Sequence, residues 1–122
     1  MSVELNHTIV WVRDKAASAA FLAGILDVPV GAPEGPFLPV RLANRVTLDF
    51  ADTDDVRGQH LAFLVSDIEF DEAFARLRAA GIAHWADPMH QQPGEINHWL
   101  GGRGVYFEDP DGHNMELLTR AQ

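Results

Sequence analysis

The sequence predicts an α+β fold built from two similar units, each with one strand, one helix and about three further strands. The first observation is a repeat, because His7 and His60 each open an apolar run that an aspartate closes, at Asp14 and Asp67. The second observation is that one helical pattern follows each run before short strands return. A single helix among hairpins is typical of an α+β unit and not of a doubly wound parallel sheet.

The first copy contains three strand patterns and one helical pattern, over residues 5–12, 37–42 and 46–50 and over residues 15–26. Alternation within the first strand places His7 and Trp11 on the same face. Asp14 is a suitable cap for the helix. The expected apolar face of this helix consists of Ala17, Ala20, Phe21, Gly24 and Ile25. Proline and glycine in residues 29–36 end the helical pattern, and Asn44 marks a hairpin turn.

The second copy contains four strand patterns, over residues 60–65, 82–86, 104–108 and 114–119. Ser66 and Glu69 have the spacing of a capping box. The helix that they begin carries apolar or small residues at helical intervals, at Phe70, Phe74, Leu77 and Gly81. Residues 96–100 are expected to be extended. Residues 109–112 (DPDG) have proline at the second place and glycine at the fourth, which predicts a type I turn.

The length of 122 residues predicts one domain over residues 1–122. We expect a first module over about residues 3–51, a linker over residues 52–58 and a second module over about residues 59–120. The linker is polar and charged, and it separates the two copies of the repeat.

Composition excludes several classes of partner and site. The formal net charge of −9 argues against a nucleic-acid or anionic-membrane partner, because both select clustered lysine and arginine. The chain contains no cysteine, so disulfides and thiolate ligands are excluded. No apolar run approaches the roughly 20 residues of a membrane span, and the first residues lack the pattern of a signal peptide. These features fit a cytoplasmic protein.

Three ionisable side chains interrupt otherwise apolar strands, at His7, His60 and Glu116. Burying a lone carboxylate there would be costly, an objection that a bound cation removes. Two imidazoles and one carboxylate form the facial triad of non-haem Fe(II) sites and also serve catalytic zinc. Asp49 lies on the last strand of the first copy, as Glu116 does in the second, and is a candidate fourth ligand. The alternatives are ordinary core or rim histidines, and an Asp49 that caps its hairpin or pairs with Arg45.

Three segments make the chain resemble the vicinal oxygen chelate superfamily, which includes glyoxalases, extradiol dioxygenases and bleomycin-resistance proteins. They are residues 5–8 (LNHT), 60–67 (HLAFLVSD) and 104–117 (GVYFEDPDGHNMEL). The resemblance implies paired βαβββ modules whose mixed sheets curve into a cup. It implies metal ligands at His7, His60 and Glu116, a divalent ion (Fe²⁺, Zn²⁺, Ni²⁺ or Mn²⁺) and a homodimer. Asp49 stands where glyoxalase-type members place a glutamate or glutamine.

Further residues are candidates for catalysis or substrate contact in such a cup. Asp49 is a candidate base as well as a ligand. His98 is a candidate proton shuttle or substrate contact, and Tyr106 is expected to point its hydroxyl into the cup. Arg103 is a candidate partner for an anionic group. Candidate pocket walls are Trp11, Phe50 and Trp99. The alternatives are a surface histidine, a solvated arginine and ordinary core packing of the aromatic rings.

The resemblance implies a metal-dependent enzyme that binds two neighbouring oxygens of a small-molecule substrate on a divalent cation. Glyoxalase-type lyase or isomerase chemistry and extradiol-type dioxygenase chemistry are both open from the sequence. The alternative function is metal-free sequestration of a drug, as in bleomycin-resistance proteins, and the acidic charge would suit a cationic drug.

Overall fold

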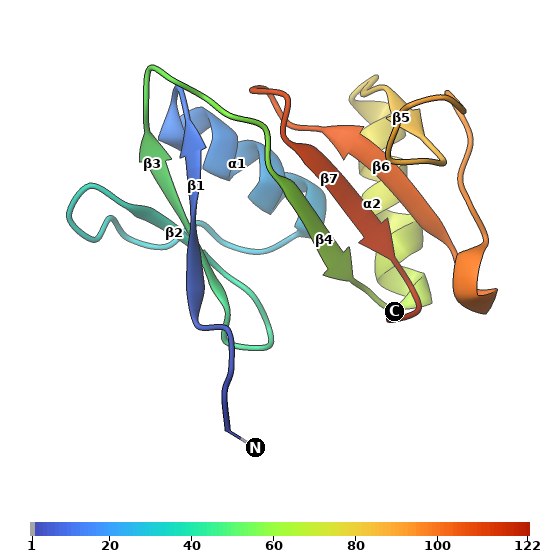
Figure 1. The fold of residues 1–122 in the computed structure, drawn as a ribbon, viewed down its shortest axis with the longest axis horizontal. Coiled ribbons are helices and arrows are strands. Elements are labelled where there is room, and N and C mark those ends of the chain that lie inside the picture. Colours follow the sequence, from blue (N-terminus) through green and yellow to red (C-terminus); the bar gives the residue numbers. More distant parts are fainter. Residues whose placement is uncertain (1) are drawn as a thin grey trace. The chain divides into compact units, whose positions relative to one another are not determined.

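The computed structural model describes residues 2–122 and contains two compact units, the first ending at Arg57 and the second running from Gly58 to Gln122 (Figure 1). The predicted α+β class is confirmed, because each unit combines one mixed sheet with one α-helix. The boundary between the units lies within the predicted linker, residues 52–58. No helix in residues 2–122 is both long and apolar enough to cross a membrane.

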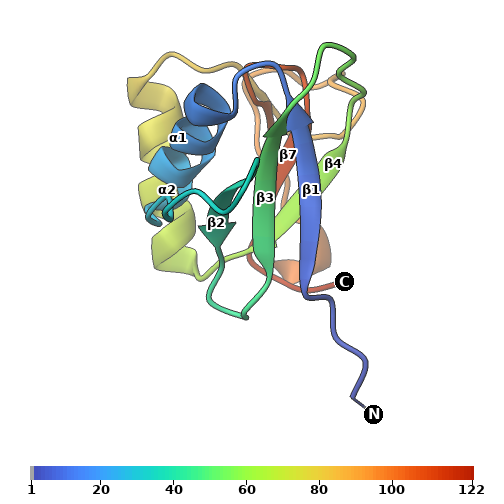
Figure 2. The same cartoon turned by 90° about the vertical axis from the view of Figure 1, so that its left-hand side faces the viewer.

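The first unit consists of strand β1 (His7–Val12), helix α1 (Lys15–Leu26) and strands β2 (Leu38–Arg41) and β3 (Thr47–Asp52). The sheet has the order β1-β3-β2, with β1 parallel to β3 and β2 antiparallel to it. Figure 2 shows α1 lying along one side of this sheet. Outside these strands, an isolated bridge joins Val30 to Val40 of β2.

Helix α1 begins as predicted, because the Asp14 carboxylate accepts a hydrogen bond from the Ala17 N–H at 3.1 Å. The predicted apolar face is wrong except at Ile25. The residues that the helix buries are Ser18, Ala19, Leu22, Ala23 and Ile25. Apolar residues surround this alanine-rich helix on most sides, so the sequence contains little contrast from which to choose the buried face.

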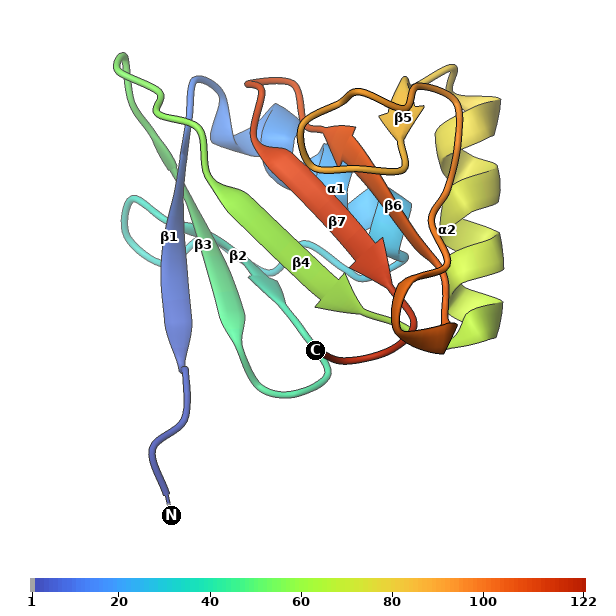
Figure 3. The same cartoon turned by 45° about the vertical axis from the view of Figure 1, so that its right-hand side comes forward.

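The second unit consists of β4 (His60–Leu64), α2 (Asp67–Ala79), β5 (His84–Trp85), the 3₁₀ turn η1 (Trp99–Gly101), β6 (Gly104–Glu108) and β7 (Asn114–Leu118). The sheet has the order β4-β7-β6-β5, in which β4 is parallel to β7 and the other pairs are antiparallel. Figure 3 shows α2 against one side of this sheet. The fully buried Met115 and Leu117 alternate along β7 with Asn114, Glu116 and Leu118 on the opposite face.

Two predicted local motifs are present in the second unit. The capping box is complete, because Ser66 Oγ accepts from the Glu69 N–H at 3.1 Å and Glu69 Oε1 accepts from the Ser66 N–H at 2.8 Å. The predicted turn at residues 109–112 closes with a hydrogen bond of 3.1 Å from the Gly112 N–H to the Asp109 carbonyl. Both motifs fix where the next element begins.

Residues 96–100 are not extended, which corrects the prediction from sequence. Asn97 bridges to Gly104, and the chain then enters the 3₁₀ turn. The Asn97 amide donates to the Ala86 carbonyl at 2.7 Å and accepts from the Trp99 N–H at 3.2 Å, so it bends the chain through contacts distant in sequence. A Cβ atom at Gly104 would lie 2.7 Å from Asn97 Oδ1, so this close approach requires glycine.

Candidate metal centre

Glu116 is a buried carboxylate in the middle of β7, with 5% of its surface exposed. Its neighbours across the sheet are Ala62 on β4 and Tyr106 on β6. All three lie on the face opposite Met115 and Leu117. The carboxylate therefore stands on the sheet face predicted from the alternation of β7, and it requires a partner for its negative charge.

His60 supplies one partner for this carboxylate. Its Nε2 lies 3.1 Å from Glu116 Oε1, and its Nδ1 lies 2.9 Å from the Asn114 carbonyl oxygen. A carbonyl oxygen only accepts hydrogen bonds, so Nδ1 carries a hydrogen. Neutral His60 then presents the Nε2 lone pair to a carboxylate oxygen. Two such electron-rich atoms at this distance need a cation between them, either a metal ion or the second imidazole proton, so the pair fits a metal centre.

His7 is oriented in the same way in the first unit. Its Nδ1 lies 2.7 Å from Asn6 Oδ1, which is an acceptor, so Nε2 carries the lone pair in the neutral ring. The ring is exposed at the start of β1. An oxygen partner on one imidazole nitrogen is the usual support of a histidine that binds metal through the other nitrogen. Asn6 and Asn114 supply such oxygen partners to His7 and His60, and neither was singled out from the sequence.

Asp49 lies on β3 and shares a sheet face with His7, because Ile9 pairs with Asp49 and His7 with Thr47. Neither alternative proposed for its side chain occurs. Within residues 2–122 the Asp49 carboxylate neither caps the hairpin nor forms a salt bridge with Arg45. Its role as a fourth ligand or as a base stays a prediction.

No three His, Asp or Glu side chains gather into a metal-binding group within either unit, in the part of the chain described. The second unit contains the pair formed by His60 and Glu116, and His7 belongs to the first unit. The predicted triad of His7, His60 and Glu116 thus names residues of both units. Its assembly stays a prediction.

Tyr106 is the neighbour of Glu116 on β6. Burial raises the pKa of Tyr106, and the negative charge of Glu116 raises it further. The phenol therefore stays protonated beside the carboxylate. Its ring stacks on His60 with 5.9 Å between centroids, and the centroid of the Trp99 ring lies 6.2 Å from that of Tyr106.

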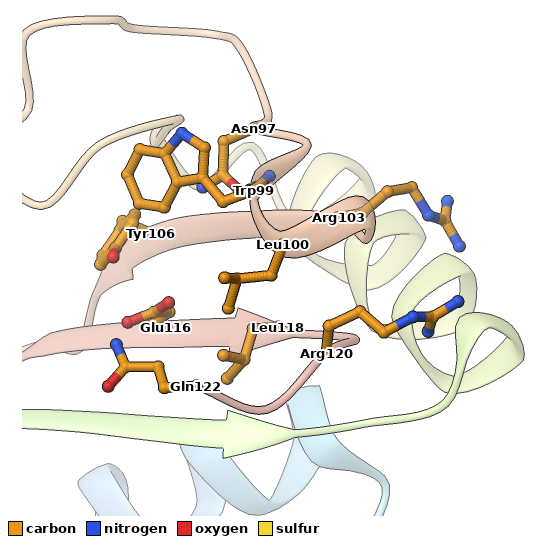
Figure 4. A pocket seen from close by; sticks show the side chains of 9 residues that line it. All are labelled: Asn97, Trp99, Leu100, Arg103, Tyr106, Glu116, Leu118, Arg120 and Gln122. Atoms are coloured by element: carbon orange, nitrogen blue, oxygen red, sulfur yellow. Dashed lines mark hydrogen bonds between the residues drawn. The ribbon is translucent and has the colours of Figure 1, made fainter.

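A small pocket of about 50 Å³ opens beside Glu116 and Tyr106 (Figure 4). This space accommodates a few water molecules. Trp99 and Leu100 border the pocket from the 3₁₀ turn, and both side chains are more than one third exposed. The remaining lining residues are Asn97, Arg103, Leu118, Arg120 and Gln122. Leu118 and Arg120 share the alternation of Glu116, a signal that could have identified them from sequence.

The guanidinium of Arg103 is engaged with α2 and does not lie over Glu116 (Figure 4). It donates to Asp71 at 2.6 Å and to the Asp67 carbonyl at 3.0 Å, and it lies 4.6 Å from the centre of the Phe70 ring. The hydrogen bond to Asp71 is the main cause that raises the pKa of Arg103. Arg103 thus fastens the start of β6 to α2, and the predicted anionic ligand would have to displace these contacts.

The other predicted contact residues are not among those that line this pocket. Phe50 is fully buried on the opposite face of β3 from Asp49, so the alternative of ordinary core packing describes it. Trp11 is 44% exposed on the His7 face of β1. His98 is exposed immediately before η1 and is not among the pocket residues. Sequence periodicity placed Trp11 correctly on its face but could not place a loop side chain such as His98.

Comparison with known proteins identifies relatives along the whole chain. The family model of the Glyoxalase/Bleomycin resistance protein/Dioxygenase superfamily matches residues 4–117. The solved structure of Oxidase ChaP-H2 is similar with 57% identity and a TM-score of 0.97, covering 99% of this chain and 96% of that chain. Glutathione transferase FosA of Serratia marcescens is 29% identical over 96% of this chain and 81% of its own length. Metallothiol transferase FosB of Bacillus licheniformis is 25% identical over 94% of this chain and 74% of its own length.

Proposed function

Because the chain belongs to the glyoxalase/bleomycin resistance protein/dioxygenase superfamily, we propose that it is a divalent-metal-dependent oxidase acting on a small molecule with two adjacent oxygens. The observation that carries this proposal is the pair formed by His60 and Glu116. The imidazole Nε2 and the buried carboxylate lie 3.1 Å apart, and the Nδ1–H of the same ring is held by a carbonyl. This arrangement supports a metal ligand set better than it supports an isolated ion pair.

Similarity among relatives supports the oxidase class. The relative named an oxidase is 57% identical across nearly the whole chain, whereas the two thiol transferases are 29% and 25% identical. The structure adds one observation against an anionic thiol or phosphonate substrate. Arg103 lines the pocket but is occupied by Asp71 and Asp67. An oxidase therefore accounts for both the relatives and the charge around the pocket.

The proposed metal ligands are His7, His60 and Glu116. Two imidazole nitrogens and one carboxylate are the donor set of non-haem Fe(II) oxygenases, so we propose iron as the working metal. When bound, the ion supplies Lewis acidity toward the two substrate oxygens and redox chemistry with dioxygen. Three protein ligands leave room for a substrate that binds through both oxygens. Asp49 is then a base or a fourth ligand, with fewer open positions in the second case.

The chain's own residues hold this donor set in place. Asn6 and Asn114 orient the two imidazoles. Because burial and the charge of Glu116 keep the phenol protonated, we propose that Tyr106 donates a hydrogen bond to that carboxylate and does not remove a proton from the substrate. Trp99 borders the pocket beside Glu116. His98 stays a candidate proton shuttle on the exposed segment before η1.

Anaerobic titration with Fe(II) or Co(II) tests the proposal. The wild-type protein should bind about one ion per chain, and His60→Ala should lose that binding while its unfolding transition stays close to wild type, because the ring is partly exposed. Asp49→Ala in the same titration separates three ligands from four, since unchanged affinity would show that Asp49 does not coordinate. His84→Ala is the matched control, because His84 contacts the Phe74 ring and not Glu116.

If the wild-type protein binds none of the divalent ions, that result would contradict the proposal that it is a metal-dependent enzyme. The metal-free sequestration of a cationic drug would then describe the protein better, and binding of such a drug without metal would be the corresponding measurement. Loss of metal binding in His84→Ala as well as in His60→Ala would also count against the proposed ligand set, because it would indicate a general effect on the fold.

A further inference from the structure

His90 forms a second histidine contact on β7, at Asn114. Its Nε2 lies 3.0 Å from Asn114 Oδ1, and Asn114 Nδ2 donates to the Pro88 carbonyl at 3.2 Å. The Pro88 contact fixes which end of the amide is the acceptor, so Nε2 of His90 is the donor. The imidazole also stacks on Trp85, with ring centroids 3.8 Å apart and ring planes inclined by 4°. The side chain of His90 is therefore held on two sides.

The backbone at His90 indicates that this side chain has a role. Its φ is +59°, in the left-handed region that costs free energy for residues with a Cβ. Glycine would relieve that strain, yet an imidazole occupies the position. Residues in strained conformations persist where surrounding contacts hold them, and they concentrate at functional sites. The Trp85 ring and the Asn114 amide hold the side chain, and the His90 N–H donates to the Asp87 carbonyl at 3.2 Å.

We propose that His90 is a positioning residue that, through Asn114, fixes the imidazole of His60. Asn114 accepts from His90 with its side chain and from His60 Nδ1 with its backbone carbonyl, at 3.0 and 2.9 Å. The same His60 ring reaches Glu116 with Nε2. Asn114 thus connects His90, in the segment after β5, to the His60 ring that faces Glu116.

Asn114 stands where β7 begins, directly after the turn at residues 109–112. Its backbone pairs with His60 on β4 and with Glu108 on β6. Its side-chain amide is anchored to His90 and Pro88, both in the segment after β5. Loss of the His90 contact should let the Asn114 carbonyl shift and weaken its hydrogen bond with the His60 Nδ1–H. The consequence for metal affinity rests on the proposed function, whereas the consequence for His60 does not.

Three variants separate positioning from stability. His90→Gly removes the side chain and relieves the positive φ, so the free energy of unfolding should not fall markedly. His90→Gln keeps an N–H donor near the place of Nε2 and should restore the contact. His90→Asn tolerates a positive φ but is too short to reach Asn114, and it replaces His90→Gly if the glycine variant does not fold. His84→Ala is the control, because His84 lies on β5 next to Trp85 but is not part of the contacts that join His90, Asn114 and His60.

The first readout is the rate at which the His60 Nδ1–H exchanges with solvent in the metal-free protein, measured from its NMR signal. Wild type, His90→Gln and His84→Ala should show a protected Nδ1–H, because the Asn114 carbonyl accepts it, whereas His90→Gly should show faster exchange. The second readout is Fe(II) affinity, which should weaken about tenfold in His90→Gly and return toward wild type in His90→Gln, as expected for an outer partner of a metal ligand.

The outcomes distinguish this inference from the proposed function. If His90→Gly keeps the His60 Nδ1–H protected and keeps wild-type Fe(II) affinity, His90 does not position the site, and the metal proposal stands. If the wild-type protein does not bind Fe(II) but His90→Gly still loses protection of the His60 Nδ1–H, the metal proposal fails and the positioning role stands. If His90→Gln fails to restore that protection, the hydrogen bond to Asn114 is not the connection, and the inference is overturned.

Discussion

Glu116 is the residue that connects the sequence to the proposed chemistry. A carboxylate in the run from Met115 to Leu118 cannot be explained by packing, and alternation predicted the face on which it lies. His60 was predicted to share its site, and its Nε2 lies 3.1 Å from the carboxylate. The orienting partners Asn6 and Asn114 were not predicted. Their roles depend on a side-chain rotamer and on a backbone carbonyl, and neither leaves a periodic signal in the sequence.

Asp109 allows a prediction at the scale of one carboxyl group. Its Oδ1 accepts from the Asp111 and His113 N–H groups, whereas Oδ2 is buried without a hydrogen-bond partner among the residues described. Burial raises the pKa of Asp109, which the hydrogen bond from His113 only partly opposes. The folded protein therefore binds this proton more tightly than the unfolded chain, and ionisation of Asp109 lowers the free energy of unfolding as the pH rises above the ordinary value of 3.8.

Asp109→Asn keeps the Oδ1 acceptor and removes the buried charge, so we expect it to be at least as stable as wild type in urea unfolding at pH 7. Its advantage should shrink as the pH is lowered toward 3.8, where wild-type Asp109 becomes protonated. Asp109→Ala removes both turn contacts and should cost about 1–3 kcal/mol. An asparagine variant as unstable as the alanine variant would show that the negative charge itself stabilises the turn.

Among the helices and strands, boundaries set by short-range motifs were predicted well, whereas features set by long-range contacts were predicted poorly. The Asp14 cap and the Ser66–Glu69 box mark the starts of both helices, because each motif acts within three residues. The predicted buried face of α1 was wrong, because alanines lie on several sides of this helix and give little contrast between its faces. The turn at η1 was missed because Asn97 bends the chain by binding Ala86, a contact that only the folded sheet creates.

The capping box of α2 should make stability depend on pH in one direction. The hydrogen bond from the Ser66 backbone N–H is the main cause that lowers the pKa of Glu69 below its ordinary value of 4.5. Its contribution is therefore present above pH 4.5 and is lost as the pH falls through the lower pKa of the folded state. Glu69→Gln keeps an acceptor for the Ser66 N–H without the charge.

Urea unfolding of wild type and Glu69→Gln between about pH 3 and pH 7 measures this effect. Wild type should be the more stable protein at pH 7, and the difference should disappear toward pH 3. Ser66→Ala, which removes the other half of the box, should cost about 1 kcal/mol at every pH at which Glu69 is ionised. A difference between wild type and Glu69→Gln that grows on acidification would contradict the proposed contact.

At the scale of the whole molecule, the triad requires a His7 from a first module and a His60 with Glu116 from a second module. We expect a homodimer, and mixing two inactive variants tests whether the modules come from different chains. His7→Ala and His60→Ala, each unable to bind Fe(II), should regain about a quarter of the wild-type binding when equal amounts are unfolded and refolded together, because about half of the dimers are mixed and each mixed dimer contains one intact site of two. If the site lies within one chain, the mixture should bind no more than its components.

The family and fold class followed from the sequence because the repeated histidine runs and the segment from Gly104 to Leu117 are dense with local signals. The substrate did not follow from it, because the pocket walls come from Trp99, Leu100 and Arg120, which lie in a turn and beyond the last strand. Their positions depend on where the chain folds back after β5 and after β7. Loop placement of this kind is set by tertiary contacts and not by periodicity.

We propose that His7, His60 and Glu116 together hold one divalent cation. Elemental analysis of protein purified without chelator measures whether they do. We expect about one divalent ion per chain, with iron predominating when purification is anaerobic and Fe(II) is supplied. Protein that contains no metal, and that takes up none when Fe(II), Zn(II), Ni(II) and Mn(II) are added in turn, would contradict it.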